Sequence, residues 1–481
     1  MTIEPVRRQS IIHLFTNLSI TAIGFFAIIY FARVAGASVL GTYFLFTAYF
    51  SIFELIAYSG LCSAAVKRIS EGQDKDEFYS ASAILQLILL LIFIGLIFTI
   101  KIFLAGPDPE DLYLWLIISL IVNLPLVIFW TGNYGLGKAG IIQISKFLDY
   151  ITKIVIQVIA IFFGFKFAGL AGGFISGIAI SALINFRYVE LHFRRFTLFH
   201  LKSLFSFFFW QSLTLSGFLV ITSTDVLFIA YYMSTADVGI YRVAFQLAVL
   251  GLFVTFAVQN VLFPRFSRWN QEGNKGLIAT SLAKAYTFSL ALAIPYCVGG
   301  WLTGSLLLEY VFGTEFSSGA GALFILLLAL IAAVFPILQV MTLNALNQPK
   351  YSFYVTAVAV VVNIALNILL IPLFGINGAA IATLISIMIY SIGGYIVLRN
   401  YIRVKIARKS IYNIIRATTV MALIVTGFRI FLPTINFPLL ICLVVIGAVT
   451  YFVTLLKIDR DIHDELKEII VQMGITWPKW L

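Results

Sequence analysis

The chain has 481 residues, of which 61% are hydrophobic and only 11% are charged. Soluble globular proteins carry roughly 25% charged residues, so this composition excludes a soluble globule. The formal net charge of +11 could suggest nucleic-acid binding. In so apolar a chain the positions of the basic residues are the better guide, and we expect no nucleic-acid partner.

Apolar stretches long enough to cross roughly 30 Å of hydrocarbon recur along the whole sequence. The first follows Arg7 and Arg8 and is too long for the core of a signal peptide. Short connections rich in Gly, Pro, Asn and Asp separate the stretches. The sequence therefore predicts an all-α integral membrane protein with about fourteen spans, at residues 11–34, 40–65, 80–104, 112–131, 141–164, 168–190, 204–232, 238–263, 278–304, 318–343, 351–372, 377–398, 411–432 and 437–456.

Lysine and arginine are distributed unevenly among the predicted connections. With the N-terminus placed inside, 26 of the 32 fall at inner-side positions. The exceptions are Arg33, Lys101, Lys153, Lys166, Arg242 and Arg429. Because cytoplasmic loops are enriched in these residues, the asymmetry predicts a multi-pass protein of the cell (cytoplasmic or inner) membrane. It also predicts that both termini are cytoplasmic and that the number of spans is even.

Two parts of the chain repeat one pattern about 200 residues apart. Residues 40–43 read Leu-Gly-Thr-Tyr and residues 238–241 read Val-Gly-Ile-Tyr, and each group precedes an apolar span that ends in basic residues. A Thr-x-Asn pattern recurs at 131–133 and 342–344. The offset equals six spans, an even number, so the two copies have the same orientation and an axis along the membrane normal relates them.

The repeat predicts five segments. We expect two parallel six-helix lobes, at residues 1–190 and 204–402, joined by a linker helix at residues 191–203. Two additional spans at residues 403–457 and a tail at residues 458–481 follow. The linker and the tail mix basic and apolar residues, which is typical of amphipathic helices on the inner membrane surface. The alternative is that both are plain connectors.

The fifth span carries the most charged face within the membrane. Lys146, Asp149, Lys153 and Gln157 follow one another at spacings that place them on one side of a helix. Charges inside spans are costly and therefore mark candidate functional sites. We expect Lys146, Lys153 and Gln157 to line a polar cavity and bind substrate, with Lys153 at a phosphate. The alternative is an ion pair of Asp149 with either lysine that satisfies only itself.

Four other ionisable residues lie in or beside spans. Arg33 and Arg242, one in each half, are expected near the outer side, where they guide an anionic headgroup or extend to the interface. Glu54 lies near the middle of the second span and is a candidate for proton coupling, with a structural role as the alternative. Asp149 and Asp225 complete the candidate ion-coupling set; for Asp225 the alternative is a pair with Arg242.

Patterns for cofactor chemistry are incomplete. Residues 132–139 read Gly, four residues, Gly, Lys, Ala, and so lack the Ser or Thr that a phosphate-binding loop uses for magnesium. Cys62, Cys297 and Cys442 lie in apolar spans without metal or redox spacing. There is no nucleophile triad, and the loops are too short for a catalytic domain. We therefore expect no enzymatic activity, no cofactor and no metal site.

Several stretches, in this order and spacing, resemble the Wzx-like polysaccharide biosynthesis and lipid-linked oligosaccharide flippases of the MATE-like MOP exporter superfamily. The matching residues are 225–230, 238–241, 262–267, 363–372 and 375–383, and the resemblance spans about residues 10–455. It implies that the lobes form a V around a central cavity and that Asp225 is a family acidic position. It also implies a flippase that moves a polyprenyl-diphosphate-linked oligosaccharide to the outer leaflet by alternating access.

The same scaffold leaves other functions open. The resemblance also extends to cation-coupled multidrug exporters of the MATE type and to flippases for a peptidoglycan lipid precursor. A polymerase or scaffold would need a long outer loop with convergent polar residues, which the sequence does not contain. Expected partners are the lipid-linked oligosaccharide, membrane lipids, H+ or Na+ as coupling ion, and a polysaccharide polymerase or glycosyltransferases.

Overall fold

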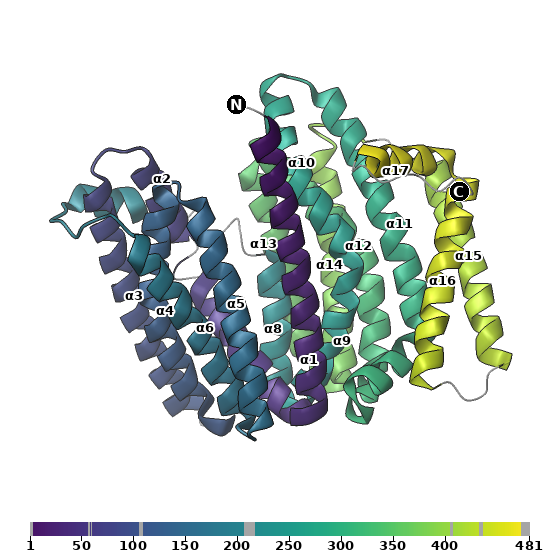
Figure 1. Ribbon diagram of the computed structural model, residues 1–481, viewed down its shortest axis with the longest axis horizontal. Coiled ribbons are helices and arrows are strands. Elements are labelled where there is room, and N and C mark those ends of the chain that lie inside the picture. The colour runs from purple at the N-terminus through teal and green to yellow at the C-terminus, as the bar shows by residue number, and fades with distance from the viewer. Residues whose placement is uncertain are drawn as a thin grey trace. The chain divides into compact units, whose positions relative to one another are not determined.

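The computed structural model describes residues 3–55, 58, 60–104, 109–205, 217–404, 407–431 and 436–472 (Figure 1). Within these ranges the chain is almost entirely helical and contains no strand. Eleven helices of this part are long and apolar enough to cross a membrane. The predicted all-helical membrane class is therefore confirmed, whereas the number of fourteen spans stays a prediction.

Local features of three helices explain why eleven spans are found. Helix α1 (Ile3–Glu54) runs through the first two predicted spans, and its only break is at Gly36, whose φ of 81° and ψ of 173° suit glycine. Helix α5 (Ala139–Phe162) is apolar overall but carries three charged residues. Helix α8 (Gly217–Tyr232) is short, and the preceding residues 206–216 lie outside the described part.

The chain forms two compact units, Met1–Gly239 and Ile240–Leu481. The first contains α1, α2 (Gly60–Ser70), α3 (Lys75–Leu104), α4 (Leu112–Gly135), α5, α6 (Lys166–Tyr188) and α8, followed by the start of α9 (Thr235–Val249). The division falls later in the chain than the predicted linker at 191–203, because α8 packs against α1 in the first unit.

The second unit contains the remaining helices. These are α10 (Phe253–Gln271), α11 (Lys275–Leu307), α12 (Ala320–Ala345), α13 (Pro349–Phe374), α14 (Ile376–Leu398), α15 (Arg408–Phe431), α16 (Phe437–Ile458) and α17 (Arg460–Gln472). Helix α14 packs on α12 and α13, and α15 and α16 pack on α11. Short non-α turns at Leu250–Leu252, Leu308–Phe312 and Thr314–Gly319 connect these helices.

The two repeat-related glycines lie against each other inside the first unit. A Cβ atom on Gly41 of α1 would lie 2.8 Å from the backbone nitrogen of Gly239, and one on Gly239 would lie 3.1 Å from that of Gly41. Beside them the hydroxyls of Ser38 and Thr235 are 3.0 Å apart. The close approach explains why both copies of the pattern carry glycine.

The predicted helical linker is extended in its first half. Residues 191–197 have no helical structure, and a helix begins only at Leu198. The backbone N–H of His192 donates to Asp76 at 3.0 Å, and that of Arg194 donates to Ser80 Oγ at 2.8 Å. These bonds to the first turns of α3 satisfy N–H groups that a helix would have used internally. Whether the segment contacts a membrane surface stays a prediction.

Helix α17 runs across the end of α16 (Figure 1). Asp459 begins it, since its Oδ1 accepts the N–H of Ile462 at 3.0 Å while its Oδ2 accepts the side-chain amide of Asn413 at 3.0 Å. Ile462 is buried in an apolar cluster with residues of α15 and α16, and Leu466 packs against the same cluster. The predicted tail thus turns its apolar side to the protein; Trp477 and Trp480 lie outside the described residues.

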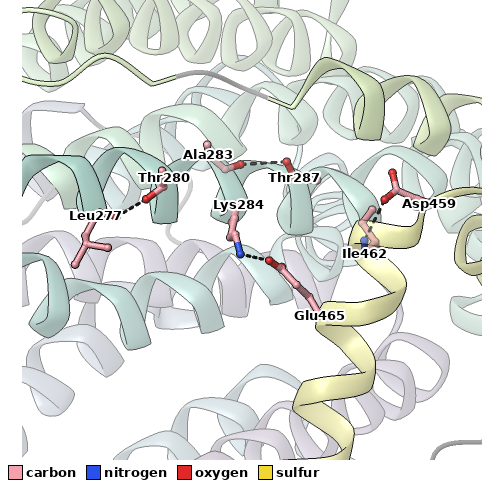
Figure 2. Close-up of polar contacts among 8 residues, drawn as sticks. All are labelled: Leu277, Thr280, Ala283, Lys284, Thr287, Asp459, Ile462 and Glu465. Carbon is pink, nitrogen blue, oxygen red and sulfur yellow. Dashed lines mark hydrogen bonds and ion pairs between the residues drawn. The ribbon is translucent and has the colours of Figure 1, made fainter.

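An ion pair joins α17 to α11, as Figure 2 shows. Lys284 of α11 pairs with Glu465, one turn beyond the buried Ile462. Lys284 is largely exposed, so the pair itself contributes little to stability. The packing of α17 therefore depends mainly on its apolar residues and on the Asp459 cap.

Candidate functional site

A polar cavity of about 540 Å³ lies within the first unit, among α1, α2, α4, α5 and α6. It contains Glu54 of α1 together with Lys146 and Asp149 of α5. The sequence placed Glu54 on the second span and the other two on the fifth, and the structure brings all three into one cavity. Its charged lining therefore consists of two carboxyl groups and one amine, a combination that can bind a cation, a phosphate or both in turn.

The charged face of α5 divides into two parts. Lys146 is exposed and Asp149 half-buried, and both line the cavity. Among the described residues, no carboxylate and amine are paired within 4.0 Å at Asp149, Lys146 or Lys153. The self-contained ion pair considered above is thus not formed among the described residues, and the roles of Asp149 and Lys146 stay predictions.

Lys153 and Gln157, one and two turns further along, have different surroundings. Lys153 is absent from the cavity lining; its ammonium lies 4.4 Å from the ring centre of Tyr150 and 5.9 Å from that of Phe174. Gln157 is 1% exposed, and its amide donates to Tyr43 Oη at 3.0 Å and to the Leu170 carbonyl at 2.7 Å. We therefore assign Gln157 to the packing of α5 against α1 and α6, and Lys153 to an aromatic cage.

Two glycines of α6 produce this arrangement. A Cβ on Gly173 would lie 3.0 Å from the Lys153 carbonyl oxygen, and one on Gly177 would lie 2.7 Å from the Asp149 carbonyl oxygen. Glycine lets two membrane helices approach this closely. Helix α6 thereby covers the later turns of the polar face of α5 and leaves the earlier turn, with Lys146, open to the cavity.

An amide network holds α4, α5 and α6 around the cavity. Asn133 of the Thr-x-Asn pattern donates to the carbonyl and side-chain oxygens of Asn185 at 2.9 and 3.1 Å. Asn185 in turn donates to Ser145 Oγ on α5 at 2.9 Å. Each of the three side chains is at most 1% exposed. Hydrogen bonds across packed helices stabilise membrane proteins modestly, and here they position α5, the helix that carries Lys146 and Asp149.

Sequence reasoning did not identify Asn123. This residue of α4 is 2% exposed, lines the cavity, and its Nδ2 has no hydrogen-bond partner among the described residues. A buried donor without an acceptor costs free energy unless a ligand or water accepts from it. The available signal was an isolated asparagine within an otherwise apolar span, a pattern that marks functional positions in membrane helices.

The remaining predicted site residues do not line this cavity. Arg33 is exposed on α1, just before the break at Gly36, and Asp225 is fully buried in α8. Arg242 belongs to the second unit, where its guanidinium lies 5.2 Å from the ring centre of Phe245. Their roles in substrate guidance and ion coupling stay predictions.

Lys138, the lysine of the incomplete phosphate-loop pattern, has a structural position. Its ammonium lies 2.7 Å from Glu190 and also donates to the Tyr188 carbonyl at 2.7 Å. The hydrogen bond and charge of Lys138 lower the pKa of the Glu190 carboxyl. The lysine thus fastens the start of α5 to the end of α6.

A family model described as polysaccharide biosynthesis protein matches residues 6–270. The chain belongs to this family. Over 426 residues it is 27% identical to the probable low-salt glycan biosynthesis flippase Agl15 of Haloferax volcanii, covering 88% of this chain and 89% of the relative. The predicted membership of the polysaccharide biosynthesis family is confirmed.

Solved structures share this fold at low sequence identity. The lipid II flippase MurJ in its inward closed conformation superimposes with a TM-score of 0.79 at 18% identity, covering 94% of this chain and 99% of MurJ. An inward-facing multidrug resistance transporter of the MATE family gives a TM-score of 0.63 at 18% identity, covering 79% and 94%. The chain is therefore a multi-pass membrane protein with the fold of these transporters.

Proposed function

We propose that this protein is a flippase that moves a lipid-linked oligosaccharide of the polyprenyl-diphosphate type from the cytoplasmic to the outer leaflet. The observation that carries the proposal is a cavity with three ionisable side chains in its lining, in a chain of the polysaccharide biosynthesis family. A sugar headgroup needs such a polar path, because hydrocarbon offers no partners for its hydroxyls. The lipid chain stays in the bilayer while the headgroup crosses by alternating access.

In this proposal the cavity residues divide the work. Lys146 attracts the phosphate groups of the headgroup through a charge-assisted hydrogen bond. Asn123 donates its free amide hydrogens to sugar hydroxyls. Glu54 and Asp149 bind H+ or Na+ in exchange, so that an ion gradient drives return of the empty carrier. The product would pass to a polymerase or glycosyltransferase on the outer side, with both termini cytoplasmic.

The first prediction concerns Lys146. We expect Lys146→Gln to slow flipping at least 10-fold, because one charged hydrogen bond contributes roughly 1.5–3 kcal/mol. The assay uses purified protein in vesicles with a fluorescent polyprenyl-diphosphate glycan, read as the fraction protected from an added quencher. Lys350→Gln removes an equally exposed lysine at the start of α13, outside this cavity, and should flip at the wild-type rate. Equal rates in the two variants would contradict the assignment.

A cation-coupled drug exporter is the second candidate, and the cavity charges favour it in one respect. Glu54 and Asp149 outnumber Lys146 there, and Lys153 points to aromatic rings instead. Carboxyl groups suit cationic drugs more than phosphates. The same vesicles can distinguish the two functions. Efflux of a cationic dye without any glycan flipping would support the exporter. Glycan flipping without dye efflux would support the flippase.

A further inference from the structure

A second polar cavity, of about 760 Å³, lies in the second unit beside α11, α12 and α14. It extends to the end of α14 and the residues that follow it. The lining residues used below are Tyr395, Ile392, Ser391, Gln339, Arg399 and Arg403. None of them belongs to the cavity that contains Lys146.

Two arginines form the charged end of this cavity. Arg399 directly follows α14, Arg403 lies four residues further on, and both are exposed. Within the described ranges neither guanidinium has a carboxylate within 4.0 Å. A guanidinium has only donors and presents them in a planar fork that matches phosphate oxygens. Two such groups in one cavity therefore suit a phosphate or diphosphate.

Polar groups continue into the protein from the arginines. Gln339 of α12 is 3% exposed and forms a side-chain hydrogen bond with Tyr286; its Oε1, which lies against Gly394 of α14, accepts no hydrogen bond from the described residues. The hydroxyl of Ser391 donates to the Ala332 and Ile387 carbonyls, each at 2.9 Å, and its oxygen can still accept. Two acceptors near two cationic donors are complementary to a phosphate that carries a hydroxylated group.

The outer wall of the cavity is apolar. Ile392 and Tyr395 lie one turn apart on α14 and are 60% and 58% exposed. They line the same cavity as the arginines. A hydrocarbon chain attached to the phosphate could lie along this wall without leaving the bilayer. The combination of arginines, buried acceptors and an apolar wall is that of a lipid-phosphate site, and a free phosphate would leave the apolar wall unused.

We propose that this cavity binds a lipid through its phosphate or diphosphate group. Arg399 and Arg403 hold the phosphate, Gln339 accepts a hydroxyl of the headgroup, and the chain lies against Ile392 and Tyr395. The ligand is either the polyprenyl diphosphate of the transported glycan or a membrane phospholipid. Only the first of these ligands rests on the proposed function. In that case the site would capture the substrate at the predicted inner leaflet before the headgroup enters the cavity that contains Lys146.

The test uses the full chain in phosphatidylcholine nanodiscs. Binding of farnesyl diphosphate and of dioleoyl phosphatidylglycerol is measured by native mass spectrometry. We expect the double variant Arg399→Gln, Arg403→Gln to weaken binding of both lipids by about 10- to 100-fold, because it removes charged hydrogen bonds to the phosphate. Ile392→Trp places a larger side chain in the space proposed for the hydrocarbon chain and keeps both arginines. It should weaken binding of both lipids as well. Arg408→Gln removes an exposed arginine outside the cavity and should bind as wild type.

The outcomes separate the alternatives. Tighter binding of farnesyl diphosphate than of phosphatidylglycerol identifies a substrate site, and the reverse order identifies a resident phospholipid. Wild-type binding by the double variant, or an equal loss in Arg408→Gln, overturns the proposal. If flipping proves absent while this binding is lost only in the Arg399, Arg403 and Ile392 variants, the site stands and the proposed function fails.

Discussion

Gly177 shows how a residue without a side chain positions a charged one. Its Cα lies against Asp149 and Lys153, so α6 can approach α5 to the distance at which backbone atoms touch. A larger residue there would push α6 away and open the polar face of α5 to lipid. The position of the Asp149 carboxyl in the cavity therefore depends on a glycine in the neighbouring helix.

The second prediction tests this contact. Gly177→Ala places a Cβ 2.7 Å from the Asp149 carbonyl oxygen and 3.0 Å from Lys153 Cβ. Overpacking of this kind costs about 1–3 kcal/mol. We expect a lower thermal midpoint in detergent, measured by fluorescence-detected size-exclusion chromatography. Gly140→Ala on α5, where a Cβ meets nothing within 4 Å, is the control and should be neutral. An unchanged midpoint for both variants would show that α6 adjusts without cost.

At the scale of elements, short polar contacts decide how connecting segments lie. Asp76 and Ser80 hold residues 191–197 extended, and Asp459 both begins α17 and accepts from Asn413 of α15. Asp459 is 3% exposed, so water cannot replace either bond. One carboxylate thus fixes the direction in which the chain leaves α16.

Asp459→Ala is the third prediction. Loss of a helix cap costs about 1 kcal/mol, and the unpaired amide of Asn413 adds roughly 1–3 kcal/mol. We expect faster amide hydrogen exchange throughout α17, with the membrane helices protected as before. Asp461→Ala alters an exposed acid in the first turn of the same helix and should leave exchange nearly unchanged. Wild-type protection of α17 in Asp459→Ala would mean that Ile462 and Leu466 alone hold it.

Across the whole molecule, the internal repeat has diverged in its polar residues. The pattern glycines Gly41 and Gly239 kept their contact, whereas the two polar cavities differ in charge. The first unit has Glu54, Asp149 and Lys146; the second has Arg399 and Arg403. The two cavities thus carry different charges, acidic and basic in the first unit and basic in the second.

The fourth prediction concerns that coupling. A membrane potential supplies about 2.3 kcal/mol per charge per 100 mV, so one or two coupled cations suffice for modest accumulation. We expect Glu54→Gln to reduce the stimulation of flipping by an imposed pH gradient at least 5-fold, because an amide cannot carry the proton. Glu71→Gln, at an exposed acid paired with Arg68, should respond as wild type. An unaltered response in Glu54→Gln would leave Glu54 a structural residue.

The sequence by itself determined the membrane class, the duplicated pattern and the family. Those properties follow from hydrophobic run length, from the distribution of Lys and Arg, and from local motifs, none of which needs tertiary contacts. It also identified the charged face of α5, because helical periodicity relates residues three and four apart. The break at Gly36 fell between the first two predicted spans, where only a short connection separated them.

Only the tertiary structure decided which charged residues share a cavity. Periodicity places Lys146, Asp149, Lys153 and Gln157 on one face, but it does not say which neighbour covers each turn. The glycines of α6 let that helix cover Lys153 and Gln157 and leave Lys146 open, while α1 brings Glu54 to the same cavity. These contacts join residues far apart in the chain, and they depend on how closely two backbones can approach, which no single helix determines.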